Sequence, residues 1–359
     1  MTLPQIPSAT VPPEVPLPTL PSDVGDALGP DVPGAPCPAV SGALVQTNER
    51  APDHAGSYLT DAEGSFVRVL TDQPATAVSP DGKYYAFYGP DGQLCIGPTA
   101  GGASIALRWQ LPGQPLNANA HVATPWSPDG SRLLVLRSDA PTNDVFVVDI
   151  ATHRFARVTP PESATYDSAD WAPDSARVAV SGSDGVTVMS VNGSELAHPA
   201  SGATVPGRLQ WAPMVDVIYV RIQQLGDELV PVVGGSTIDV SGYIDYTWRA
   251  DRSAAVLPGG PPNQFGIRAP DGSYHLIFNE PVVFEVGNLR WGSDTHRVLY
   301  FGRVSSPPDG HAGSAIGYIL DDGSRGSPMV GADDSSGYTF SNFFTSAGAS
   351  TVVYNVSPL

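Results

Sequence analysis

Residues 126–136 read Trp-Ser-Pro-Asp-Gly-Ser-Arg-Leu-Leu-Val-Leu, which is an aromatic residue, a polar turn and then an aliphatic run. Pro-Asp-Gly favours a tight turn because proline fixes φ and glycine adopts positive φ without strain. Two more apolar segments, 144–148 and 155–158, follow at short intervals with turn residues between them. The stretch therefore predicts a unit of short strands in which 133–136 is the second strand.

The same pattern recurs along the chain. It is clear at three anchor residues, where Pro-Asp is retained, and weaker at the four that follow. The seven anchors, 37 to 53 residues apart, are Val78, Trp126, Trp171, Trp211, Trp248, Trp291 and Phe344. Repeats of this length with four strands each are typical of β-propeller blades. We therefore predict an all-β, seven-bladed propeller over residues 56–359, with six blades as the less favoured count.

These Trp-Ser-Pro-Asp-Gly units resemble the WD40-like, or PD40, repeats of the TolB-like family of bacterial propellers. The resemblance covers residues from about 56 to 359. By the family's template, residues 57–64 and 67–71 are the third and fourth strands of a blade, and residues 351–354 are a second strand. The resemblance thus implies a propeller closed by its N-terminal strands. It also implies a protein that binds protein partners, because TolB-like members do so with their rims and funnel.

Residues 1–45 form a different segment, rich in proline. Proline fixes φ and removes backbone donors, so we expect this arm to be extended and similar to polyproline II. One interpretation is a spacer. The other is a docking arm that binds a protein partner or the next copy of this chain. The apolar residues that would make this contact are Val11, Val15, Leu17, Leu20, Val24 and Leu28.

The charge of the chain excludes some classes of partner. The net charge is −18, whereas nucleic acids and anionic membrane surfaces are bound through positive fields. The sequence has no apolar run of about 18 residues, so we expect no membrane insertion. The first residues lack the features of a signal peptide, so the chain is either made without one or begins after its removal. The single lysine, Lys83, indicates a GC-rich bacterial source. We favour an extracytoplasmic location (periplasm, cell surface or secreted) and leave the cytoplasm open.

The two cysteines, Cys37 and Cys95, leave two interpretations open. A disulfide between them would tie the arm to the first blade. Alternatively, each is an unpaired buried cysteine.

We find no catalytic motif in the sequence. It contains no Gly-x-Ser-x-Gly elbow, no phosphate-binding loop and no His-Glu-x-x-His. The acidic pairs 321–322 and 333–334 can be calcium ligands or, more simply, turn residues. We also expect Asp81, Asp129 and Asp174 to be turn residues, and the anchor tryptophans to pack between blades.

We therefore expect no catalytic residue, no metal ligand and no cofactor. The favoured function is a non-enzymatic protein-binding or structural scaffold, a subunit of an extracellular or cell-envelope assembly. One alternative is a propeller enzyme, a lactonase or a carbohydrate-active enzyme, with a metal or carboxylates in the funnel. The other is a small-ligand sensor.

Overall fold

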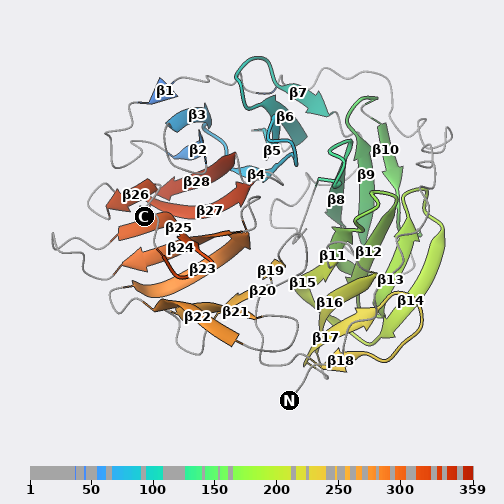
Figure 1. Cartoon of the computed structure of the whole chain (residues 1–359). Coiled ribbons are helices and arrows are strands. Elements are labelled where there is room, and N and C mark those ends of the chain that lie inside the picture. Colours follow the sequence, from blue (N-terminus) through green and yellow to red (C-terminus); the bar gives the residue numbers. More distant parts are fainter. Residues whose placement is uncertain are drawn as a thin grey trace.

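The structure is a computed structural model of the whole chain (Figure 1). The residues that it describes are 37, 44–45, 55–61, 67–89, 94–107, 126–139, 142–152, 154–160, 165–211, 216–223, 226–239, 247–248, 255–258, 264–268, 274–279, 283–291, 296–304, 313–324, 330–333, 338–345 and 351–358. All regular elements in these segments are strands. The described part of the chain contains no helix that could cross a membrane.

The described strands form seven small antiparallel sheets, five of them four-stranded with the strands in chain order. The first two of these five consist of β4 (Ala75–Val78), β5 (Tyr84–Tyr88), β6 (Leu94–Pro98) and β7 (Ile105–Leu107), and of β11 (Tyr166–Trp171), β12 (Arg177–Gly182), β13 (Gly185–Ser190) and β14 (Glu195–Ser201). The third consists of β15 (Thr204–Trp211), β16 (Val217–Ile222), β17 (Gly226–Pro231) and β18 (Ile238–Asp239). The fourth and fifth consist of β19 (Thr247–Trp248), β20 (Ala255–Pro258), β21 (Gln264–Arg268) and β22 (Tyr274–Asn279), and of β23 (Val283–Trp291), β24 (Arg297–Val304), β25 (Gly313–Leu320) and β26 (Val330–Asp333).

The sixth sheet contains the segment from which the repeat was recognised. Its strands are β8 (Arg132–Asp139), β9 (Thr142–Asp149) and β10 (Arg154–Arg157). The predicted second, third and fourth strands of this unit are therefore present. Before them in the chain, an isolated bridge pairs Trp126 with Leu133.

The seventh sheet is built from both ends of the chain, and we call it the terminal sheet. Its strands, in spatial order, are β1 (Leu44–Val45), β3 (Val67–Thr71), β2 (Gly56–Thr60), β28 (Val352–Pro358) and β27 (Tyr338–Thr345). In Figure 1 the blue strands β2 and β3 lie beside the red strands β27 and β28. Antiparallel pairing joins β2 to β28, and the ring of Tyr58 stacks on that of Tyr354 at 5.4 Å between centroids.

The structure changes the boundary of the predicted arm, which we placed at residues 1–45. The last two of these residues form β1, which pairs with β3 through Leu44 opposite Arg68 and Val45 opposite Val67. The arm therefore ends as a strand of the terminal sheet. Residues 1–36 lie outside the described part of the chain.

The cores lie between successive sheets, because the central strands are buried on both faces. Val178 and Val180 of β12 pack against the sheet of β8–β10, whereas the intervening Ala179 packs against the sheet of β15–β18. The strictly alternating direction of side chains along a strand produces this two-sided burial. Aliphatic runs such as the one in β12 are thus explained by contact with two neighbours.

Three anchor tryptophans, Trp126, Trp171 and Trp211, are buried in these layers. Trp171 packs among residues of β8 and β9, and Trp211 among residues of β12 and β13. Their predicted role, packing between neighbouring units, is confirmed. The side chains of Trp248 and Trp291 lie outside the described residues.

Candidate functional site

The predicted partner-binding residues of the arm, Val11, Val15, Leu17, Leu20, Val24 and Leu28, lie outside the described residues. The two cysteines are joined in a disulfide, with 6.0 Å between their Cα atoms. Cys95 is the second residue of β6 and is fully buried, whereas Cys37 is half-buried. The arm is therefore covalently attached to the sheet of β4–β7 at Cys37.

The Pro-Asp turns form polar sites of the same design. In one, the hydroxyl of Ser127 donates to Asp129 Oδ1, and that carboxylate also accepts the N–H of Ser131. Ser79 and Asp81 repeat this arrangement. Burial disfavours the charge on Asp129, but hydrogen bonds from Ser127 and Ser131 outweigh it and lower the pKa of its carboxyl. These aspartates are turn residues, as predicted.

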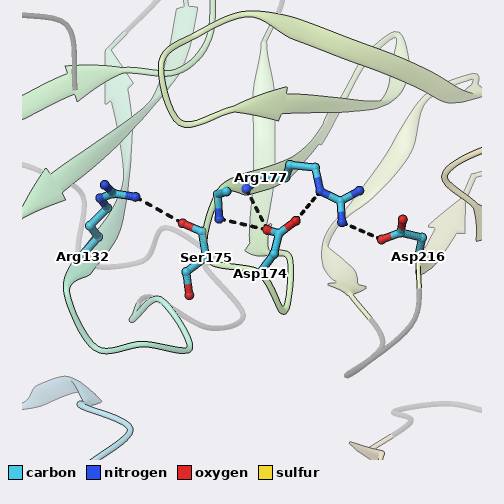
Figure 2. Close-up of polar contacts among 6 residues, drawn as sticks. Arg132, Asp174, Ser175, Arg177 and Asp216 are labelled. Carbon is cyan, nitrogen blue, oxygen red and sulfur yellow. Dashed lines mark hydrogen bonds and ion pairs between the residues drawn. The ribbon is translucent and has the colours of Figure 1, made fainter. Parts of the chain in front are cut away.

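Side chains also connect each of two turns to the next sheet (Figure 2). Arg132 Nη1 donates to the carbonyl oxygen of Ser175 at 3.2 Å. Arg177 Nε donates to Asp174 of its own turn at 2.6 Å, and Arg177 Nη2 donates to Asp216, beyond Trp211, at 2.7 Å. Each arginine is the sixth residue after its anchor tryptophan. The two turns therefore contact the next sheet through arginines at equivalent positions of the repeat.

A buried carboxylate joins two sheets beside these turns. Asp170, in β11, is buried; its Oδ1 accepts the N–H of Trp171 at 2.8 Å and its Oδ2 accepts the N–H of Trp211 at 2.6 Å. Asp170 thus fixes the backbone of two successive anchors relative to each other.

The buried side-chain amide of Asn355 connects the terminal sheet to the sheet of β4–β7. Asn355 Nδ2 donates to the carbonyl oxygen of Ala75 at 2.8 Å, and Asn355 Oδ1 accepts the N–H of Ala75 at 3.0 Å. Ser57 Oγ donates to the same Oδ1 at 2.8 Å. Ser57 Oγ also accepts the N–H of Ala75 at 2.7 Å, so Asn355 of β28 and Ser57 of β2 both bind the beginning of β4, in the next sheet.

The surroundings of Asp167 in β11 raise the pKa of its carboxyl group. Its Oδ1 lies 3.5 Å from the hydroxyl oxygens of both Ser181 and Thr204. Burial raises the pKa of Asp167 to about 6, although these hydroxyls lower it. The side chain lies where β11 approaches β15 of the next sheet, so its charge affects the contact between two sheets.

Asp167→Asn is expected to stabilise the protein above pH 6 and to have much less effect near pH 4. The folded-state pKa of about 6 exceeds the ordinary 3.8, so the folded state binds the proton more tightly. Stability therefore falls as the pH rises from about 4 to about 6, and asparagine removes this loss. The gain should be about 1 kcal/mol after allowance for partial exposure. Urea unfolding at pH 4 and pH 7 measures it, and equal gains at both pH values would contradict this account.

A hollow of about 190 Å3 lies over the sheet of β11–β14. It is lined by Pro160, Tyr166, Gly182, Asp184, Gly185, Thr187, Glu195 and His198. His198 Nδ1 lies 3.0 Å from Thr187 Oγ1. Small-molecule sites usually enclose about 300–1,000 Å3, so this hollow is small for one.

Asp321 and Asp322 do not belong to a metal-binding group among the described residues. Asp322 accepts the N–H and the hydroxyl of Ser324, which makes it a turn residue. Asp321 lies 3.0 Å from His296 Nδ1, on the neighbouring turn of the same sheet. Of the other pair, Asp333 ends β26 and Asp334 lies outside the described residues.

The polar residues brought together by the fold thus hold turns and connect sheets. Sequence reasoning missed Asp170, Asn355, Arg132 and Arg177. The two arginines could have been recognised in the sequence, because each lies at the same distance along the chain from its anchor tryptophan. Asp170 could have been recognised too, since it is a charged residue directly before a buried anchor.

No protein-family model matches this chain, and no curated protein is similar to it. Among solved structures, the chain is similar to a putative TolB from Agrobacterium tumefaciens. The two share 15% sequence identity and superpose with a TM-score of 0.46. The match covers 85% of this chain and 99% of that chain.

Proposed function

We propose that this protein is a seven-bladed, TolB-like propeller with PD40 repeats, closed by its N-terminal strands, and that it is a non-enzymatic scaffold for protein partners. The contacts between sheets support the fold. Hydrophobic layers join the terminal sheet to the sheets of β23–β26 and β4–β7, which lie at opposite ends of the repeat. Strands at the ends of different sheets also touch, namely β27 and β4, β11 and β15, and β23 and β27.

The observation that carries the function is the attachment of the arm. Cys37 is bonded to the buried Cys95 of β6, so the arm is fixed at this residue to the sheet of β4–β7. A partner that binds the apolar residues of the arm would be held close to the blade rims. Such tethering raises the local concentration of the second surface and allows two weak contacts to act together.

The disulfide also supports an extracytoplasmic location. Disulfides form and persist in oxidising compartments and are rare in the cytosol. In our proposal the protein is a bacterial subunit of a cell-envelope or extracellular assembly, and the arm contacts a neighbouring subunit or another copy of the chain.

Replacing Leu17, Leu20 and Leu28 with serine is expected to abolish partner recovery and self-assembly while leaving the propeller folded. The substitutions remove apolar contact area without changing the prolines, so the arm keeps its preference for extended backbone. The measurement combines affinity recovery from the native source with sedimentation of the purified protein.

The matched control replaces Thr10, Thr19 and Ser22 of the same arm with alanine. This variant should recover the same partners as the unmodified protein. If the triple serine variant also recovers them and assembles alike, the arm is a spacer and the proposal fails.

A further inference from the structure

The disulfide lies at the contact between the terminal sheet and its neighbour. Cys95 is packed in a layer with Leu70 and Val353 of the terminal sheet and with Tyr85 and Phe87 of β5. Cys37 packs against the edge of the same layer. The bond therefore lies beside the terminal sheet, in which N-terminal and C-terminal strands pair.

The bond also changes how the N-terminal strands are tethered. On one side, β3 ends at Thr71 and β4 begins at Ala75, so a short connection joins them to the sheet of β4–β7. On the other side, the bond joins Cys37 to β6 of that same sheet. The strands β1, β2 and β3 thus form a loop whose two ends are fixed to one neighbour.

We propose that the Cys37–Cys95 bond is a redox-sensitive latch that holds β1–β3 on β28. In the oxidised protein, strands that separate from β28 remain confined between two fixed points, which limits the entropy gained by opening. After reduction the segment before β1 is free, and β1–β3 can open as a unit that is tethered only at β4. This inference rests on the pairing of β2 with β28, and holds whether or not the arm binds a partner.

The chemistry requires a dithiol reductant. A thiolate of the reductant attacks Cys37 Sγ, the more exposed sulfur, and the bond to Cys95 breaks. Cys95 leaves as a thiolate and takes up a proton, and the second thiol of the reductant then displaces Cys37 to form a cyclic disulfide. Two electrons pass from the dithiol to the protein. Because Cys95 leaves into an apolar layer, which disfavours a thiolate, reduction should be slow until the contact opens.

Hydrogen exchange of the full chain tests the latch. Oxidised protein, protein reduced with dithiothreitol and the variant Cys37→Ser are compared under native conditions. Amide exchange in β2 and β28 is expected to become about a hundred- to a thousand-fold faster in the reduced protein and in the variant, from the loop entropy released. Exchange in β12 and β13, which lie in a sheet without terminal strands, is the internal control and should change little.

The variant Cys37→Ser leaves the buried Cys95 in place and so creates no cavity in the layer. If the variant does not fold, reduction of the folded protein gives the same measurement. An equal loss of protection in β2 and in β12 would show that the bond stabilises the whole molecule and is no latch. Unchanged protection in β2 and β28 would show that the strands hold without it, and would also overturn the proposal.

Discussion

Deletion of residues 56–71 is expected to abolish cooperative unfolding, because it removes β2 and β3 from the centre of the terminal sheet. The deletion takes away Tyr58 and Leu70, which are 1% and 0% exposed, and leaves β28 paired only with β27. Each lost core side chain costs about 2–5 kcal/mol, and a folded domain has only about 5–15 kcal/mol of stability in total. Circular dichroism during thermal unfolding measures the loss of the transition.

The matched control deletes residues 1–36, which retains Cys37 and its bond to Cys95. This variant is expected to unfold cooperatively at nearly the temperature of the full chain. If both deletions had the same thermal midpoint, the terminal sheet would not hold the molecule together, and the closed propeller would be wrong.

The sequence predicted the parts of the fold that local chemistry decides. The turn at Asp174 followed by the apolar run of β12 is one example, since proline, aspartate and alternating burial act within about ten residues. The strand predicted at residues 57–64 overlaps β2, which the structure describes at Gly56–Thr60, because the template of the resembling family supplies the order of strands in a blade. The pairing of β2 with β28 follows from that order.

The polar contacts between sheets could not be predicted, because their partners are distant in the chain and differ from one sheet to the next. Asn355 and Ala75 are separated by 280 residues, and Asp170 and Trp211 by 41. Arg297 is again the sixth residue after an anchor, and its guanidinium lies 5.2 Å from the ring of Tyr318 in its own sheet.

The short strand β1 was missed for a different reason. It lies in the segment that proline content marks as an arm, and two residues carry no periodic pattern. Its pairing depends on the edge of β3, which only the folded terminal sheet presents. An edge strand offers unpaired backbone groups to any nearby extended segment. Leu44 and Val45 therefore need no strand propensity of their own to pair with the edge of β3.

Trp171→Ala is expected to lower the free energy of unfolding by about 3–5 kcal/mol, the usual cost of removing a large core aromatic side chain. Trp171 is 3% exposed and packs in the layer between the sheets of β8–β10 and β11–β14. Its loss would leave a cavity bordered by Leu134 and Val178, on strands of two different sheets that cannot both shift inwards without disturbing their other faces. Urea unfolding followed by tryptophan fluorescence and circular dichroism measures the change.

Two variants make the result specific to packing between sheets. Trp171→Phe keeps an aromatic ring and should cost clearly less than Trp171→Ala, because the remaining cavity is smaller. Tyr84→Ala removes an aromatic side chain that is 39% exposed, and should cost no more than about 0.5–1 kcal/mol. A cost below about 1 kcal/mol for Trp171→Ala would place this side chain among surface residues. The anchor tryptophans would then only accompany the turns, and the packing between sheets would be stabilised by the aliphatic residues of the strands alone.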